Sequence, residues 1–97
     1  MSRRGARSYH AVGHRDANER SIIEALEARG FSVTQVQGRG VPDLLVSKHK
    51  TVWLVEVKQP KKGYTPAQVE WRARWLGPEI WCLRTIEEAM RFPEVRA

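Results

Sequence analysis

Two short apolar runs separated by a polar turn constrain the fold of this chain most strongly. Residues 44–46 (Leu-Leu-Val) and 52–55 (Val-Trp-Leu-Val) have the composition of buried strands, and residues 48–50 (Lys-His-Lys) between them are typical of a turn. A carboxylate flanks each run, because Asp43 precedes the first and Glu56 follows the second. A charged carboxylate beside a sheet core is costly unless it is paired or binds a cation, so this pattern predicts a hairpin with a polar site at its open end.

The polar site is expected to contain a lysine as well. Alternate residues of a strand share a face, so Glu56 and Lys58 point the same way. If residues 43–47 pair with residues 51–58, Asp43 lies near both of them. Two carboxylates and a lysine suit a hard divalent cation and a water nucleophile, which fits phosphodiester hydrolysis. The alternatives are a Pro-Asp turn for Asp43 and a surface ion pair between Glu56 and Lys58.

The positive charge is concentrated at the N-terminus. The formal net charge is +6, and residues 1–15 contain no acid. The basic residues of this segment are Arg3, Arg4, Arg7 and Arg15. A basic patch indicates a polyanionic partner, most often nucleic acid, with chance as the alternative. We expect residues 1–14 to form a flexible basic arm, because they contain few apolar side chains that could pack.

The length and the cysteine content limit the class of protein. A chain of 97 residues is sufficient for one domain, which we place at residues 15–97. No apolar run approaches the roughly 20 residues that span a bilayer, and no signal-peptide core follows the N-terminus. The single cysteine, Cys82, lies in an apolar context and is expected to be buried. A soluble protein of a reducing compartment is therefore expected.

The remaining patterns predict an α/β chain of order α-β-β-β-α-β-α. Two capping boxes support the helices: Asp16 with Glu19 opens the first, and Thr65 with Gln68 opens the second. The predicted elements are a helix from about residue 16 to 29, strands at 31–36, 43–47 and 51–58, a helix from 65 to the Gly77-Pro78 pair, a strand at 79–83, and a helix capped by Thr85 that ends before Pro93.

The motifs resemble those of a known family. Pro42-Asp43 followed by Glu56-Val57-Lys58 resembles the split motif of the PD-(D/E)XK nuclease superfamily. With Asn18-Glu19 upstream and Thr65-Pro66-Ala67-Gln68 downstream, the chain is similar to the virus-type replication-repair nuclease (VRR-NUC) domain over about residues 15–91. The resemblance implies a restriction-endonuclease-like core, with a mixed central sheet flanked by helices. Stand-alone copies of this domain are typically short phage or bacterial proteins.

The resemblance also implies roles for individual residues. Asp43, Glu56 and the backbone carbonyl of Val57 would bind Mg²⁺ or Mn²⁺, with Glu19 as a further ligand. Lys58 would orient or deprotonate the attacking water, and Gln68 would hold a ligand, a water or a phosphate. Helix capping is the alternative role for Glu19 and for Gln68. The residues expected to contact the substrate backbone are Lys61, Lys62 and Tyr64, together with the arginines of the arm.

The function implied by this resemblance is a structure-selective, metal-dependent DNA endonuclease. We expect a homodimer that cleaves four-way (Holliday) junctions in the cytoplasm of a bacterial or phage-infected cell. The nearest alternative is a monomeric flap or branch nuclease. Two further alternatives are a sequence-specific restriction-like nuclease and a DNA-binding module that has the fold but no activity.

Overall fold

The computed structural model describes residues 17–94, and the predicted basic arm lies outside this range. The elements are α2 (Glu19–Ala28), β1 (Ser32–Gln35), β2 (Leu44–Lys48), β3 (Thr51–Val57), α3 (Pro66–Arg74), β4 (Trp81–Leu83) and α4 (Ile86–Arg91). The predicted order of helices and strands is confirmed. The helices of this part of the chain include none that is long and apolar enough to cross a membrane.

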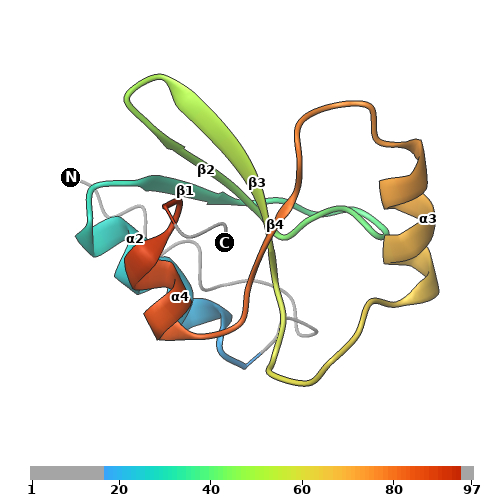
Figure 1. The fold of residues 1–97 in the computed structure, drawn as a ribbon, viewed down its shortest axis with the longest axis horizontal. Helices are drawn as coiled ribbons and strands as arrows, with labels where there is room; N and C mark the ends of the chain where they lie inside the picture. The colour runs from blue at the N-terminus through green and yellow to red at the C-terminus, as the bar shows by residue number, and fades with distance from the viewer. Residues whose placement is uncertain (1–16, 95–97) are drawn as a thin grey trace.

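The strands form one mixed sheet in the order β1-β2-β3-β4 (Figure 1). Strands β1, β2 and β3 pair antiparallel, whereas β4 pairs parallel with β3. The change of direction follows from the connection: a short turn joins β2 to β3, but α3 lies between β3 and β4 and returns the chain to the same end of the sheet. The predicted mixed sheet flanked by helices is therefore present.

One face of the sheet carries the hydrophobic core, which α2 and α4 cover (Figure 1). The buried apolar residues are Ile22, Ile23, Leu26, Phe31, Val33, Leu44, Val46, Val55, Val57, Leu83, Ala89 and Phe92. The ring of Phe92 lies 5.0 to 5.4 Å from the rings of Trp81, Trp53 and Phe31. Trp53 and Trp81 are partly buried and pack against this core.

Helix α2 begins later than the sequence predicts. Its N-cap is Asn18, so Glu19 is the first helical residue and cannot be the third residue of a capping box that starts at Asp16. Asp16 itself lies outside the described residues. The helix ends as predicted: Gly30 has φ of 93°, and the N–H groups of Gly30 and Phe31 donate to the carbonyls of Glu27 and Leu26. The predicted C-terminal end of helix α2 is therefore confirmed.

Helix α3 lies apart from the other helices, on the opposite side of the sheet (Figure 1). The predicted capping box is confirmed, because Thr65 and Gln68 exchange hydrogen bonds of 2.9 and 3.2 Å. The helix ends at Arg74, a few residues earlier than predicted, where the Trp75 indole N–H donates to the Pro78 carbonyl. No residue of α3 is fully buried, so the helix is attached to the sheet through a few side chains.

Candidate active site

The hairpin of β2 and β3 places Asp43 beside Glu56. Leu44 pairs with Val55, so Asp43, the residue before Leu44, lies at the end of β3 that carries Glu56 and Val57. The Asp43 Oδ2 atom accepts a 2.8 Å hydrogen bond from the Val57 N–H. The predicted proximity of Asp43 and Glu56 is thus found in the fold, and backbone contacts hold Asp43 in place.

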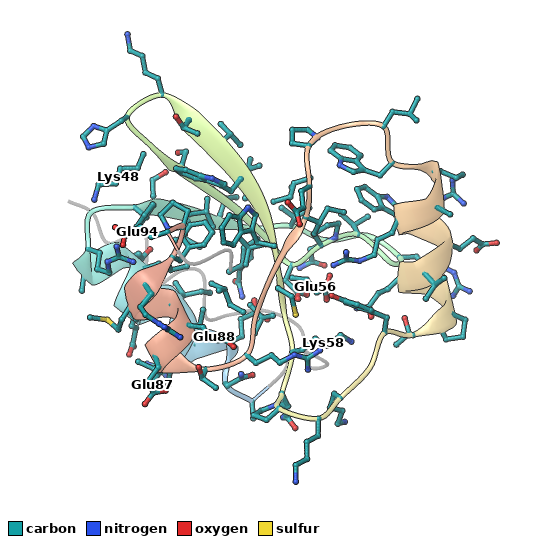
Figure 2. All side chains as sticks on the ribbon, in the orientation of Figure 1. Lys48, Glu56, Lys58, Glu87, Glu88 and Glu94 are labelled. Atoms are coloured by element: carbon teal, nitrogen blue, oxygen red, sulfur yellow. The ribbon has the colours of Figure 1, made fainter. Side chains whose placement is uncertain are left out.

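Glu56 points away from the hydrophobic core toward α3 (Figure 2). The residue is 1% exposed, and its Oε2 atom accepts a 2.8 Å hydrogen bond from Gln68 Nε2. The Gln68 Oε1 atom accepts at the same time from the Thr65 N–H at 2.9 Å. The two roles considered for Gln68 are therefore compatible: one end of the amide caps α3 and the other end holds Glu56.

The environment of Glu56 favours its protonated form. Burial and the neighbouring Asp43 raise the pKa of Glu56 to about 9, although the charges of Lys58 and Arg72 oppose this shift. Among the described residues, no donor reaches the buried Glu56 Oε1 atom. A carboxylate pair with a buried oxygen that accepts no hydrogen bond has the properties of an oxygen-donor cation site.

Two cations lie on the α3 side of the carboxylates, against one aromatic ring. Lys58 is 7% exposed and has its Nζ atom 5.6 Å from the centre of the Tyr64 ring. The Arg72 guanidinium lies 4.2 Å from the centre of the same ring. Burial, together with contact with the Cys82 thiol, raises the pKa of Tyr64. The Tyr64 ring therefore lies within cation–π distance of both the lysine of the predicted motif and an arginine of α3.

Glu19 is buried near this site but is bound elsewhere. Its Oε2 atom accepts a 2.9 Å hydrogen bond from Gln35 Nε2. Gln35 pairs with Leu44, the residue that follows Asp43. Glu19 therefore lies near the end of the sheet where Asp43 is found. Within residues 17–94, no three His, Cys, Asp or Glu side chains are grouped as a metal site. The structure therefore brings Asp43 and Glu56 together but does not add Glu19 to them.

Backbone contacts also position Lys58 and the loop after it. Asn18 Nδ2 donates to the carbonyls of Lys58 and Arg84, at 3.1 and 2.7 Å. The Arg84 side chain donates to the carbonyls of Gln59 and Lys62, at 2.9 and 2.8 Å. Lys61 and Lys62 are exposed on this loop, as contact with a polyanion requires. The predicted contact residues of the arm lie outside the described residues.

The sequence interpretation missed three features of the site. It treated Asn18 as part of a motif only, whereas its side chain joins α2 to the ends of β3 and β4. It predicted a buried Cys82, whereas this thiol is half-buried and pairs in register with Glu56. It included Arg72 only in the basic charge. The spacing of four from Gln68, which places both side chains on one helix face, was the signal that could have identified Arg72.

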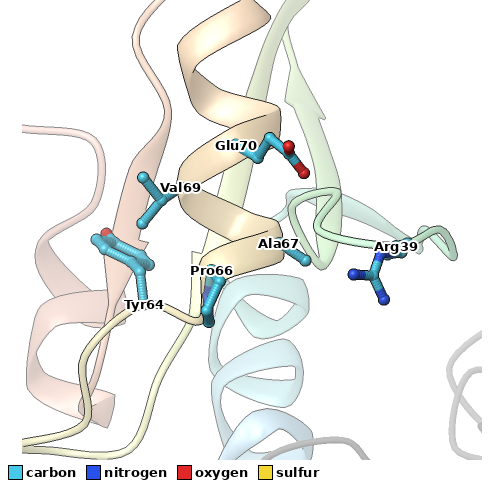
Figure 3. A pocket seen from close by; sticks show the side chains of 6 residues that line it. All are labelled: Arg39, Tyr64, Pro66, Ala67, Val69 and Glu70. Carbon is cyan, nitrogen blue, oxygen red and sulfur yellow. The ribbon is translucent and has the colours of Figure 1, made fainter.

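Two surface hollows of the described residues involve the two ends of α3, and neither is lined by Asp43 or Glu56. One, of about 500 Å³, runs along the start of α3 between Tyr64 and Arg39 (Figure 3). The other, of about 350 Å³, has an apolar lining of Leu45, Val52, Leu54, Trp75 and Pro78. The second lies on the sheet face opposite to the core.

Comparisons of the chain with protein-family models, with curated proteins and with solved structures find no match.

Proposed function

We propose that this chain is a Mg²⁺- or Mn²⁺-dependent endonuclease that hydrolyses phosphodiester bonds in branched DNA, of the VRR-NUC type within the PD-(D/E)XK superfamily. One observation carries the proposal: the half-buried Asp43 lies against the buried Glu56, beside the buried Lys58. Without a cation, two neighbouring carboxylates lower the stability of the fold. Together with a lysine they suit metal-assisted hydrolysis of a phosphate ester.

The donor set fits a hard divalent cation. Asp43 and Glu56 would hold the ion with carboxylate oxygens, and Glu56 Oε1 is the oxygen that Gln68 leaves available. The Val57 carbonyl would complete the inner ligand set and, by the resemblance, Glu19 would act through a water or on a second metal ion. A bound Mg²⁺ or Mn²⁺ supplies positive charge that polarises the phosphodiester and makes a water more acidic.

Lys58 supplies the second part of the chemistry. In hydrolysis, a water loses a proton and its oxygen forms a bond to phosphorus, while the bond to one sugar oxygen breaks and the departing oxygen takes up a proton. The buried ammonium of Lys58 would orient the water and stabilise the negative charge that develops on the phosphate oxygens. Its backbone is fixed for this task, because its N–H donates to Leu83 and its carbonyl accepts from Asn18.

The positive charge of the chain supports DNA as its partner. The net charge of +6 and the exposed Lys61 and Lys62 favour a polyanion. We propose that Arg3, Arg4, Arg7 and Arg15 add phosphate contacts and that Tyr64 borders the DNA. Such contacts read the shape of DNA and not its bases, so binding should weaken steeply with salt. The proposed compartment is the cytoplasm of a bacterial or phage-infected cell.

A homodimer is part of the proposal, because four-way junctions have near-twofold symmetry. The sheet face opposite to the core leaves Leu45 and Val52 exposed at 40% and 56%. Exposed apolar surface of this kind is typical of an interface. Light scattering distinguishes the dimer from the alternative, a monomeric flap nuclease, and a monomer that ignores four-way junctions would contradict the Holliday-junction assignment.

Metal-dependent cleavage of a DNA panel tests the function. The panel contains a four-way junction, a flap, a linear duplex and a single strand, each with Mg²⁺, Mn²⁺ or EDTA. We expect the unmodified chain to cleave the junction. Asp43→Asn and Glu56→Gln should each lower the cleavage rate at least about 100-fold. The control is Glu70→Gln, an exposed acid on α3. Unchanged cleavage by Asp43→Asn would refute the assigned site, and junction binding without cleavage would indicate the non-catalytic module.

A further inference from the structure

Helix α3 presents two polar side chains to the carboxylate pair. Gln68 and Arg72 are four residues apart and therefore share one helix face. Gln68 is hydrogen-bonded to Glu56, and the positive charge of Arg72 acts on the same carboxyl. The position of Arg72 is thus set by the helix that the Gln68–Glu56 contact holds in place.

The guanidinium of Arg72 packs on an aromatic ring. Its Cζ atom lies 4.2 Å from the centre of the Tyr64 ring. Its Nη2 atom is buried, and no described residue accepts a hydrogen bond from it. A buried charged donor without an acceptor is unfavourable. A buried arginine therefore usually binds a carboxylate or a phosphate. The half-buried guanidinium is therefore arranged to receive an anion.

The charges of the cluster support a phosphate as that anion. Asp43 and Glu56 face the two basic side chains of Lys58 and Arg72. A divalent cation on the carboxylates would leave this cluster with an excess of positive charge. Guanidinium groups match the oxygens of a phosphodiester geometrically, whereas the Lys58 ammonium acts as a point charge.

We propose that Arg72 is a catalytic residue, whose guanidinium binds a non-bridging oxygen of the scissile phosphodiester, and that Tyr64 is the positioning residue that orients it. This inference rests on the proposed nuclease function. Arg72 shares with Lys58 the charge that develops on the phosphate in the transition state. A contact of this kind acts on the rate more than on the affinity, since the protein would bind many other phosphates of the DNA as well.

The kinetic test compares two arginines of the same helix. We expect Arg72→Ala to lower the single-turnover rate by about 100- to 1,000-fold, with a loss of DNA affinity below about 10-fold. The control, Arg74→Ala, removes an exposed arginine of α3 and should leave the rate unchanged. Added methylguanidinium should restore part of the rate of Arg72→Ala, whereas Arg72→Lys should remain slow because an ammonium lacks the planar fork.

The role of Tyr64 is tested by keeping or removing its ring. Tyr64→Phe preserves the surface on which Arg72 stacks and should retain most of the rate, whereas Tyr64→Leu should lower it. Equal rates for Arg72→Ala and Arg74→Ala, or a slow Arg72→Ala enzyme that methylguanidinium does not restore, would overturn the catalytic role. The second result would mean that Arg72 only maintains the structure.

A binding experiment separates this inference from the proposed function. The dinucleotide thymidylyl-thymidine carries a single phosphodiester, and its binding with Mg²⁺ can be followed by NMR titration. We expect Arg72→Ala to bind it at least about 10-fold more weakly than the unmodified chain, and Arg74→Ala to bind it equally. If this difference is found but no DNA is cleaved, the nuclease proposal fails and the phosphate site remains. If DNA is cleaved but Arg72→Ala binds the dinucleotide as well as the unmodified chain does, the inference about Arg72 fails and the nuclease proposal stands.

Discussion

The side-chain amide of Gln68 donates a 2.8 Å hydrogen bond to the buried carboxyl of Glu56. The carbonyl oxygen of the same amide caps the start of α3. One side chain therefore couples the position of a helix to the orientation of a proposed metal ligand. Because α3 has no fully buried residue, this contact carries much of the attachment between the helix and the carboxylate site.

The two functions of Gln68 can be separated with a neighbouring residue. Thr65→Ala and Gln68→Ala each break the capping box and should each lower the free energy of unfolding by about 1 kcal/mol in urea titrations. Only Gln68→Ala also removes the contact with Glu56. We expect it to reduce DNA cleavage at least about 10-fold more than Thr65→Ala. Equal effects of both variants on cleavage would limit Gln68 to capping.

The raised pKa of Glu56 predicts an unusual dependence of stability on pH. The pKa is raised from 4.5 to about 9, so between these values the folded chain binds more protons than the unfolded chain. The free energy of unfolding should therefore fall as pH rises through this window when EDTA is present. Glu56→Gln removes this loss and should raise the melting temperature at pH 8 by at least about 4 °C.

Thermal melts between pH 5 and pH 9 provide the measurement for Glu56. The exposed Glu70→Gln change serves as the control and should keep the pH dependence of the unmodified chain. A Glu56→Gln variant with the same decline in stability would show that another group is responsible.

Binding of Mg²⁺ should stabilise the folded chain. At a concentration about 100-fold above its dissociation constant, a ligand that binds only the folded state contributes about 2.7 kcal/mol. We expect the melting temperature at pH 8 to increase with Mg²⁺ for the unmodified chain and for Glu70→Gln. Asp43→Asn, which removes a proposed ligand, should show little or no increase. Equal stabilisation of Asp43→Asn would place the ion elsewhere.

Gly40 links the loop before Asp43 to the start of α3. It has φ of 77°, and a Cβ atom at this position would collide with the backbone carbonyl of Ala67. Gly40→Ala should therefore lower the free energy of unfolding by about 1–2 kcal/mol and reduce cleavage, since α3 must shift. Gly63→Ala is the matched control, because its Cβ would meet no atom of residues 17–94 within 4 Å. Urea titration and cleavage rates of both variants give the comparison, and a neutral Gly40→Ala would contradict the close approach.

The hairpin and the pairing of its two acids could be predicted because they depend on local patterns. The apolar runs specify strands β2 and β3, and the short turn between them sets an antiparallel register. This register brings Asp43 to Glu56 whatever the rest of the chain does. The caps of α3 and α4 at Thr65 and Thr85 were equally local, and both are found.

The start of α2 shows where local patterns were insufficient. The spacing of Asp16 and Glu19 satisfies the pattern of a capping box, yet the helix begins at Glu19. Long-range contacts decide this boundary: Asn18 donates to carbonyls 40 and 66 residues away, and Glu19 accepts from Gln35. A capping hydrogen bond is worth only about 1 kcal/mol, so several tertiary contacts outweigh it.

The amino-acid sequence by itself determined the order of the elements, the mixed α/β class and the meeting of two carboxylates at one end of a hairpin. The tertiary structure decided which other side chains surround them. It buries Glu56 beneath Gln68, stacks Arg72 against Tyr64 and directs Glu19 to Gln35. These contacts join segments that are far apart along the chain or separated by a loop, and neither hydrophobic period nor turn composition encodes such distances. The electrostatics of the site follow from that packing.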